Sequence, residues 1–390
     1  MTGKGSVLVG MSGGVDSSVT AALLQQQGYE VIGITMQIWH RSQTFEDPGA
    51  MQGCCTIDAV DDARRVAARL GIPYYVPNFR EQFSHAVVDD FAGEYLQGRT
   101  PNPCVRCNQF VRFDGLIQRA DELGIDFVAT GHYARTEWDE TRGEHVLKQA
   151  IDPAKDQSYM LHTLQQSHLG RILFPLGEME KRATRQLARD FSLPVAEKPD
   201  SQEICFVAGK NYKEFLRRYV GEIERPGEIV DTRGEVVGHH RGVHEFTVGQ
   251  RRGLGVVAAG PRYVIELRSR ENQVVIGDRA EADASALHCS RLSFTGQHSE
   301  GTFSAGIKVR YRTPQRTGTV QVAGDQSYVT FAKPIWGVAP GQLAVFYDGD
   351  RVIGGGTIDR AIRAGGPAES GSPAPPTSNE SADLTRSRSG

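Results

Sequence analysis

Three cysteines stand in polar surroundings where thiol chemistry is possible. Cys104 and Cys107 lie in the segment TPNPCVRCN, and Cys205 follows much later in PDSQEICF. The residues after Cys107 place apolar side chains on one helical face, at Phe110, Phe113, Ile117 and Ala120. We therefore expect Cys107 at the N-terminus of a helix, where the helix dipole lowers the pKa of a thiol. Two distant thiols can support sulfur transfer, since one carries a persulfide and the other resolves it.

The same cysteines allow two other interpretations. The CxxC spacing of Cys104 and Cys107 could ligate zinc or an iron–sulfur cluster, but a closed site needs about four ligands. The sequence has no second CxxC pair, so Cys205 or histidines would have to complete such a site. The cysteines could also be inert buried thiols. The spacing leaves these alternatives open.

A glycine-rich segment near the start of the chain, GMSGGVDSS, could bind a phosphate group. It follows a short apolar run at residues 6–10 and precedes a stretch with a helical apolar stripe. A glycine turn between a strand and a helix points backbone N–H groups and the positive end of the helix dipole at an anion. Asp16 adds a carboxylate that could hold Mg²⁺ on a phosphate. The segment lacks the lysine of a Walker A loop, and the alternative is a plain glycine turn with a Ser or Asp helix cap.

The predicted secondary structure around these groups changes near residue 205, from alternating strands and helices to mainly short strands. Before it, β-rich runs at 6–10, 31–38, 74–76 and 127–130 alternate with helical patterns, which predicts an α/β domain with a parallel sheet. After it comes one predicted helix at 212–219, and then alternating strands joined by turn signals, as in EIVDTRGEVVGHH, RYVIELRSRENQVVIG and AVFYDGDRVIGGGTI. We predict a catalytic domain at 1–205, β-rich domains at 206–284 and 285–363, and a disordered tail at 364–390.

Composition narrows the class of protein. Six cysteines among 390 residues are too few for a disulfide scaffold. The sequence has neither a signal peptide nor a stretch approaching the ~18 apolar residues of a membrane span, so we expect a cytoplasmic protein with no membrane partner. The net charge of -3 does not decide about nucleic acid. In IKVRYR, however, a strand would place Lys308, Arg310 and Arg312 on one face, which suits RNA phosphates or is simply a solvated face.

The loop SGGVDS resembles the pyrophosphate loop of the N-type ATP pyrophosphatases, which are adenine nucleotide alpha hydrolase-like enzymes. The wider pattern resembles the tRNA-specific 2-thiouridylase family over residues 6 to about 362, through GMSGGVDSS, GITMQIW, TPNPCVRCN, ATGHYAR, KDQSYML, PDSQEICF, FTVGQRRGLG and VRYRTP in order. The resemblance implies an ATP pyrophosphatase domain followed by two small β-rich domains, of which the last is a barrel-like tRNA-binding domain.

The resemblance also implies a role for individual residues. Cys107 would be the catalytic nucleophile and Cys205 the persulfide carrier. ATP would be bound by Gly10, Met11, Ser12, Gly13, Gly14, Val15, Asp16, Ser17, Met36 and Gly131. The tRNA would be contacted by Asn102, Pro103, Cys104, His132, Lys155, Asp156, Gln157, Arg310, Tyr311 and Gln342. Some members of the family have Asp at the position of Cys104, so this chain carries an additional thiol beside Cys107.

The activity that the resemblance implies is 2-thiouridine synthesis at the wobble uridine of the tRNA anticodon loop. ATP and Mg²⁺ would adenylate the C2 oxygen, and sulfur would then replace it, with release of AMP and diphosphate. A cysteine desulfurase or a sulfur-relay protein would supply the persulfide. The alternatives are a synthetase that aminates a small adenylated metabolite, a non-catalytic RNA-binding protein, and an iron–sulfur thiolase that acts at another tRNA position.

Overall fold

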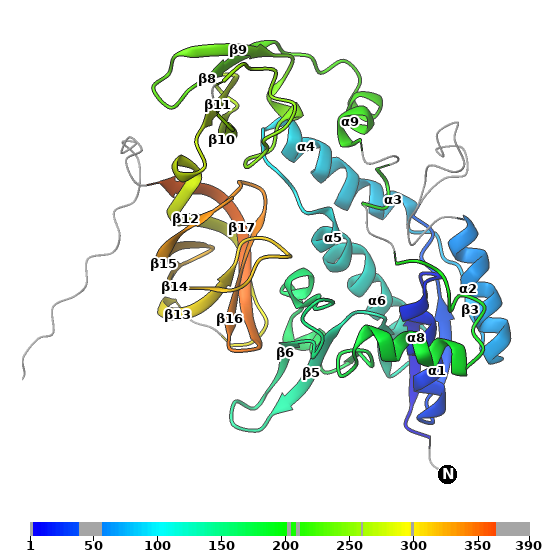
Figure 1. The fold of residues 1–390 in the computed structure, drawn as a ribbon. Coiled ribbons are helices and arrows are strands. Elements are labelled where there is room, and N and C mark those ends of the chain that lie inside the picture. Colours follow the sequence, from blue (N-terminus) through cyan, green and yellow to red (C-terminus); the bar gives the residue numbers. More distant parts are fainter. Residues whose placement is uncertain are drawn as a thin grey trace, which may run out of the picture.

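The computed structural model describes residues 3–38, 57–200, 204–207, 211–258, 260–297 and 300–363. The predicted disordered tail at 364–390 and the cysteines Cys54 and Cys55 lie outside the described residues. Figure 1 shows three parts: an α/β part that holds the N-terminus, a small sheet at the opposite end, and a β-barrel beside both.

The α/β part is built on a parallel sheet with the strand order β3-β2-β1-β4-β7. Its strands are β1 (Ser6–Gly10), β2 (Glu30–Ile34), β3 (Tyr74–Tyr75), β4 (Phe127–Thr130) and β7 (Ile172–Leu173). Neighbouring strands pair in parallel throughout, which confirms the predicted parallel sheet. The strand predicted at 31–38 is too long, because the regular ladder stops at Ile34 and only an isolated bridge joins Gln37 to Asn78.

Helices cover both faces of this sheet, as its alternating side chains require. Val7 and Val9 share an apolar cluster with residues of α1 (Val15–Gln26), α2 (Ile57–Leu70) and α8 (Lys181–Asp190). Leu8, between them, points to the other face and joins a cluster with α6 (Asp114–Leu123). Both faces are therefore buried, and functional groups can gather only at the ends of the strands.

Shorter helices and turns lie before and after α6 in the chain. They are α3 (Arg80–Phe83), the π-helical η2 (Ser84–Asp89), α4 (Asp90–Leu96), α5 (Pro103–Arg106), the π-helical η3 (Cys107–Phe113), the 3₁₀ turn η4 (Ser158–Leu161) and α7 (Gln166–Leu169). Further along the chain, α9 (Tyr212–Val220) confirms the helix predicted at 212–219.

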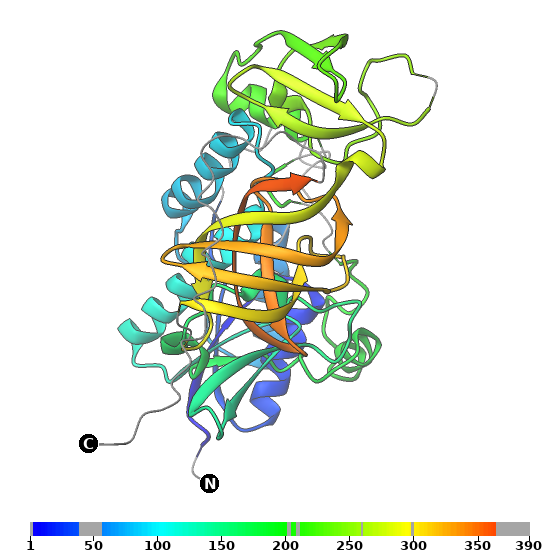
Figure 2. The same cartoon turned by 90° about the vertical axis from the view of Figure 1, so that its left-hand side faces the viewer.

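The β-rich parts confirm the predicted hairpins. A four-stranded sheet has the order β10-β11-β8-β9, formed by β8 (Gly227–Val230), β9 (Val236–His240), β10 (Tyr263–Arg268) and β11 (Gln273–Gly277). The barrel has the order β12-β15-β14-β13-β16-β17 and is closed by pairing between β12 and β17 (Figure 2). Its strands are β12 (Asp283–Phe294), β13 (Gly301–Lys308), β14 (Arg316–Ala323), β15 (Gln326–Trp336), β16 (Leu343–Asp348) and β17 (Arg351–Arg363).

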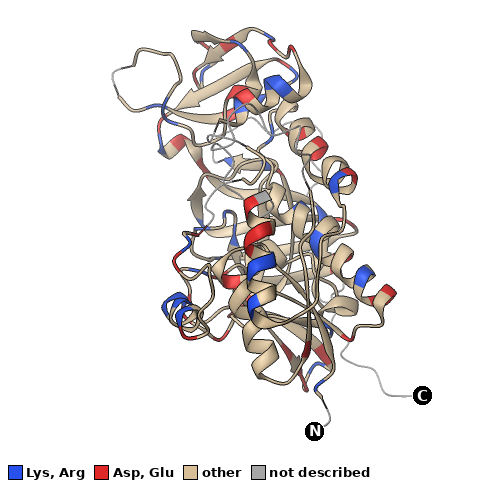
Figure 3. Cartoon of the chain, turned by 90° about the vertical axis from the view of Figure 1, so that its right-hand side faces the viewer, with Lys and Arg blue, Asp and Glu red and all other residues tan. Residues whose placement is uncertain are grey.

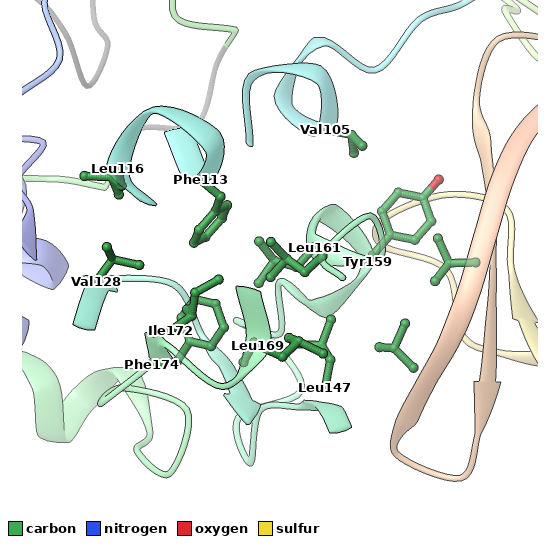
Figure 4. Close-up of a cluster of buried hydrophobic side chains, with 14 of the residues drawn as sticks. Val105, Phe113, Leu116, Val128, Leu147, Tyr159, Leu161, Leu169, Ile172 and Phe174 are labelled. Carbon is green, nitrogen blue, oxygen red and sulfur yellow. The ribbon is translucent and has the colours of Figure 1, made fainter. Parts of the chain in front are cut away.

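The barrel and the α/β part share one hydrophobic core. A hairpin of β5 (Ala134–Asp139) and β6 (Glu144–Gln149) leaves the α/β part and pairs with β17 through Lys148 and Arg351. This hairpin was not among the elements predicted from the sequence. One apolar cluster then runs from Leu8 and Val128 of the parallel sheet through Tyr159 to Val345 of the barrel. Figure 4 shows part of this cluster, with Val128 and Tyr159 labelled. This continuous packing fixes the barrel against the α/β part.

Candidate active site

The residues predicted to bind ATP meet at the carboxyl ends of three neighbouring strands. In the sheet, β2 lies on one side of β1 and β4 lies on the other. The chain therefore builds the sheet outward in one direction through β2 and β3 and in the opposite direction through β4 and β7, and the strand order reverses beside β1. Ligands of open parallel sheets bind at such a switch point. The glycine loop follows β1, Met36 follows β2 and Gly131 follows β4. The structure therefore brings these predicted residues together.

Close backbone approach explains two glycines of the site. Gly13 has a φ of +66°, and a Cβ atom there would lie 2.1 Å from the carbonyl oxygen of Ala59 in α2. A Cβ atom at Gly131 would lie 2.6 Å from the backbone nitrogen of Ser17 and 2.7 Å from the carbonyl carbon of Asp16. Both contacts are too short for any side chain. Because these two glycines have no side chain, the segment after β4 and helix α2 can pack closely against the loop.

The N-terminus of α1 faces this loop without a side-chain cap. The N-cap residue is Gly14, which has no side chain, so the alternative of a Ser or Asp cap is wrong. The Ser17 hydroxyl instead accepts a hydrogen bond from the Ser12 backbone N–H at 3.0 Å, which closes the loop on itself. The first turn of α1 therefore presents the N–H groups and the dipole that favour an anion.

Asp16, in that first turn, is the centre of a polar network that the sequence did not predict. Its carboxylate accepts hydrogen bonds from the Lys181 ammonium at 2.6 and 2.8 Å and from the Tyr133 hydroxyl at 3.1 Å. The Tyr133 hydroxyl lies 2.9 Å from Thr184 Oγ1. Burial, together with the Asp16 charge, raises the pKa of Tyr133, so that its hydroxyl stays protonated as a donor.

A second carboxylate, Asp200, gathers the basic residues around the loop. It binds Lys155 at 2.7 Å, Lys181 at 2.8 Å and Arg185 at 2.7 Å. Burial alone would raise the pKa of Asp200, but hydrogen bonds from Lys155 and Lys181 prevail and lower it to about 2. Lys198 reaches the loop from the same side, 3.0 Å from the carbonyl oxygen of Gly13 and 2.5 Å from Asp62.

These lysines suit a polyphosphate, and sequence reasoning missed them. Lys181 and Lys198 lie in α8 and in the segment after it, far from the glycine loop in the sequence and outside the motifs. The one local signal was the basic run KRATR at the start of α8. Their ammonium groups meet the loop only because α8 packs against α1 in the folded chain.

The helix that carries the first two cysteines begins earlier than predicted. It starts at Pro103, where a proline is tolerated because the first helical N–H has no partner, and runs on through η3 and α6. Cys104 lies in its first turn, whereas Cys107 lies one turn further in. The prediction that Cys107 stands at the helix N-terminus is therefore wrong, and the dipole argument does not apply to it.

Cys107 and Cys205 nevertheless pack against one apolar cluster. Both are half-buried against a cluster that includes Phe91 and Phe206, whereas Cys104 is exposed. The fourth described cysteine, Cys289, is enclosed in the barrel core, where burial raises the pKa of its thiol. Within the described ranges, no group of three or more His, Cys, Asp or Glu residues could hold a metal ion.

Several residues predicted to contact tRNA lie in the protein interior. The His132 ring is 7% exposed and its Nδ1 lies 2.8 Å from Thr130 Oγ1. Asp156 is also buried and accepts a hydrogen bond from the Ala150 backbone N–H at 3.1 Å. The Gln157 side chain accepts one from the Tyr133 backbone N–H at 2.9 Å. These contacts support the fold around the site, and a role toward tRNA stays a prediction.

The other predicted tRNA residues lie where the barrel meets the segment before Cys104. Gln342 donates to the carbonyl oxygens of Thr100 at 2.8 Å and Pro101 at 3.3 Å. Asn102 Nδ2 lies 3.5 Å from the Met160 sulfur. Pro103 is buried, and Tyr311 packs against the shared core, where burial raises the pKa of its hydroxyl.

The predicted basic stripe in IKVRYR is not formed. Strand β13 ends at Lys308, so the alternation of faces does not continue beyond it. Lys308 is buried, with its ammonium 3.9 Å from Asp156, and burial lowers its pKa. Arg310 donates to the carbonyl oxygens of Gly337 at 2.8 Å and Val248 at 3.1 Å, and burial lowers its pKa too. In Figure 3, basic and acidic segments alternate along the ribbon on the side shown.

Fold and site together define a nucleotide-binding α/β domain of the HUP type, followed by a four-stranded sheet and a closed β-barrel. Family models match in that order: a tRNA methyl transferase HUP domain at 5–209, a tRNA methyl transferase PRC-barrel domain at 213–278 and an aminomethyltransferase β-barrel domain at 284–358. The chain is 50% identical over 361 residues to tRNA-specific 2-thiouridylase MnmA of Geobacter metallireducens, covering 92% of this chain and 98% of that protein. It is 48% identical over 363 residues to the protein of the same name from Carboxydothermus hydrogenoformans, covering 92% and 99%. The chain belongs to the tRNA-specific 2-thiouridylase family.

Two further observations complete the comparison. The U34-tRNA thiolase NcsA from Methanococcus maripaludis shares 19% identity with a TM-score of 0.34, over 53% of this chain and 63% of that chain. Among the described helices, none is both long and apolar enough to span a membrane.

Proposed function

We propose that this protein is a tRNA sulfurtransferase that makes 2-thiouridine at the wobble position. One observation carries the proposal. A single α/β domain holds both a glycine loop surrounded by basic residues and two cysteines that pack against one apolar cluster. Family membership gives the substrate, because the relatives are named tRNA-specific 2-thiouridylases. The first half-reaction uses the loop, and the second uses the cysteines.

In the first half-reaction, the C2 oxygen of uridine attacks the α-phosphorus of ATP, and diphosphate leaves. The first-turn N–H groups of α1 and the ammonium groups of Lys181 and Lys198 face the region where the phosphates would lie. Negative charge grows on the leaving diphosphate, so donors that are already oriented stabilise the transition state more than the ground state. The product is an O-adenylated base with an electrophilic C2.

The Asp16 carboxylate suits a Mg²⁺ ion, because Mg²⁺ is usually held by one or two carboxylates together with substrate phosphates. Bound there, Mg²⁺ would neutralise charge on the phosphates. Lys181, which now donates to both Asp16 oxygens, would have to shift toward Asp200 or the phosphates.

In the second half-reaction, sulfur displaces AMP. The terminal sulfur of a Cys205 persulfide attacks C2 and AMP departs, which leaves the base joined to Cys205 through a disulfide. Cys107 then attacks the Cys205 sulfur and releases the thiolated base, and a reductant reopens the Cys107–Cys205 disulfide. Alternatively, Cys107 first liberates hydrosulfide from the persulfide. Both routes require a persulfide donor, such as a cysteine desulfurase or a sulfur-relay protein.

The test is a reaction with unmodified tRNA, α-labelled ATP, Mg²⁺ and a persulfide donor, in which AMP is followed. We expect AMP release that depends on tRNA and falls at least about a hundredfold in Asp16→Ala, the scale on which a positioned electrostatic group contributes to catalysis. AMP release without tRNA would instead indicate a synthetase that acts on a small metabolite. Unchanged ATP turnover in Asp16→Ala would contradict the assignment of the loop.

A further inference from the structure

An ion pair joins helix α4 to the turn that carries Cys107. Arg106, the residue directly before Cys107, donates from Nε to Asp90 Oδ2 at 3.4 Å, and its Nη2 lies 3.3 Å from Asp90 Oδ1. Two such contacts fix the orientation of a guanidinium against a carboxylate. Asp90 is the first residue of α4, and the two side chains are only 20% and 26% exposed. The pair therefore holds the backbone beside Cys107 against α4.

A ring contact joins the same helix to the segment that carries Cys205. Phe91, the second residue of α4, has its ring centre 5.0 Å from that of Phe206, at an interplanar angle of 85°. Phe206 directly follows Cys205 in the sequence, and edge-to-face contact at this distance is a favoured arrangement of aromatic pairs. Its ring centre also lies 5.8 Å from that of Phe83 and 5.2 Å from that of Phe215. Packing on several sides therefore fixes the residue next to Cys205.

Two consecutive residues of α4 thus hold the chain neighbours of both cysteines. We infer that α4 aligns Cys107 with Cys205 for sulfur exchange. Arg106 and Asp90 are positioning residues for this step. The inference rests on the proposed function, since it takes the two cysteines as the thiols of the second half-reaction. A disulfide requires Cα atoms about 4.4–6.8 Å apart with suitably directed Cβ atoms, so a small shift of either segment prevents the exchange.

The step that depends on this alignment is the attack of Cys107 on the Cys205 sulfur. The Cys107 thiolate forms a bond to Cys205 Sγ, the bond between Sγ and the sulfur on the base breaks, and the released base takes up a proton. If Cys107 attacks the persulfide itself, the same bond to Sγ forms and hydrosulfide leaves. Either exchange requires the attacking sulfur to lie close to the bond that breaks and in line with it.

Two substitutions remove the ion pair with opposite changes of charge. Arg106→Met takes away a cation next to Cys107 and keeps an unbranched side chain, whereas Asp90→Ala takes away an anion. If the pair acted only through charge, one variant would favour the Cys107 thiolate and the other would disfavour it. The exchange rates would then change in opposite directions. A loss of alignment slows the exchange in both variants.

Arg291 provides a matched control. Its guanidinium also reaches α4, at 3.7 Å from Asp90 and 2.9 Å from Glu94, but it belongs to β12 of the barrel. Arg291→Asn therefore removes ion pairs of α4 and leaves the pair between Asp90 and Arg106 in place. A general loosening of α4 would slow the exchange in this variant too, whereas positioning through Arg106 leaves its rate unchanged.

The test measures how fast the reduced full-length protein forms the Cys107–Cys205 disulfide with oxidised glutathione. The two thiols are oxidised, and glutathione disulfide is reduced to two molecules of glutathione. Samples are quenched with acid and N-ethylmaleimide, and peptide mass spectrometry follows both the mixed disulfide with glutathione and the bridge. The step within the protein thus has a rate constant of its own. Diphosphate release that depends on tRNA is measured on the same proteins and reports adenylation.

We expect bridge formation to slow at least about tenfold in Arg106→Met and in Asp90→Ala, since misplaced reacting groups lose rate on this scale or more. Diphosphate release should stay at the wild-type rate in both variants, which also shows that they are folded. A wild-type rate of bridge formation in either variant, opposite changes in the two, or equal slowing in Arg291→Asn would overturn the positioning role alone. A wild type that releases no diphosphate with tRNA would overturn the proposed function and the inference with it.

Discussion

The side-chain amide of Gln342, in the barrel, lies 2.8 Å from the carbonyl oxygen of Thr100, in the segment that leads to Cys104 and Cys107. The Thr100 backbone N–H in turn donates to the carbonyl oxygen of Pro340 at 2.7 Å. The barrel therefore holds the backbone just before the cysteine helix at two points. A module far along the chain sets the position of residues in the catalytic domain.

This contact predicts how Gln342→Met behaves. Methionine has a similar volume but no donor, so the Thr100 and Pro101 carbonyl oxygens lose their partner. We expect kcat for thiolation to fall about tenfold, the equivalent of one hydrogen bond of about 1.4 kcal/mol, with KM for tRNA almost unchanged. Steady-state kinetics with Gln118→Met, an exposed glutamine on α6, as control would check this. A raised KM for tRNA with intact kcat would show instead that Gln342 contacts tRNA directly.

Gly131→Ala should damage ATP use selectively. The added methyl group would meet the backbone of Ser17 and Asp16 at 2.6–2.7 Å, so β4 must move away from the loop. We expect kcat/KM for ATP to fall at least about tenfold, a cost of about 1.4 kcal/mol. Gly93→Ala in α4 is the control, because a methyl group there meets nothing within 4 Å. Equal kinetics for the two variants would be inconsistent with the tight fit of Gly131 against the loop.

Arg291→Asn should loosen the barrel from α4. Arg291 has a positive φ of 52°, within a stretch of β12 where the register with β17 shifts, and its guanidinium reaches Glu94 at 2.9 Å and Asp90 at 3.7 Å. Asparagine tolerates this backbone conformation, so the variant removes only the ion pairs. Because Arg291 is half-exposed, we expect a loss of about 1 kcal/mol, or a few degrees in melting temperature. Calorimetry that finds no shift would show that the ion pairs do not stabilise the docked barrel.

The sequence predicted those elements of the fold that depend on local residue patterns. The β1–loop–α1 unit and the three β-hairpins follow from residue spacing and turn chemistry within short windows, and the structure confirms them. Cys107 was misplaced because Pro103 starts the helix one turn earlier, a choice that an apolar stripe beginning at Phe110 cannot reveal. IKVRYR reads as an alternating strand, but its chain turns after Lys308.

The remainder of the site depends on contacts between distant segments. Lys181 reaches Asp16 and Asp200 only after α8 has packed against α1, and no spacing rule connects residues so far apart. The β5–β6 hairpin likewise shows its role only when β17 is beside it. Local physics therefore predicts the anion-binding turn, whereas tertiary packing determines which cations surround it.

His162 predicts a pH dependence of stability. Its ring is 1% exposed, its Nδ1 lies 3.1 Å from the carbonyl oxygen of Tyr159, and burial lowers its pKa from 6.5 to about 4. Between pH 6.5 and pH 4, His162 is protonated in the unfolded chain but stays neutral in the folded chain. The free energy of unfolding therefore falls as the pH drops below 6.5. The effect approaches about 3 kcal/mol near pH 4, at ~1.4 kcal/mol per pKa unit.

His162→Asn keeps a donor near the Nδ1 position but does not titrate. We expect its melting temperature to change less between pH 7 and pH 5 than that of the wild type. Equal pH slopes for both proteins would mean that His162 is not neutral in the folded state.

The central claim is that one enzyme activates a tRNA base with ATP and then delivers sulfur from Cys205. The most direct measurement is nucleoside mass spectrometry of tRNA treated with Cys205→Ser or wild-type protein, ATP, Mg²⁺ and a persulfide donor, with diphosphate and AMP measured in the same samples. We predict 2-thiouridine and AMP from the wild type, and tRNA-dependent diphosphate without 2-thiouridine from Cys205→Ser, because adenylation precedes the sulfur step. 2-Thiouridine made by Cys205→Ser at the wild-type rate would contradict the account.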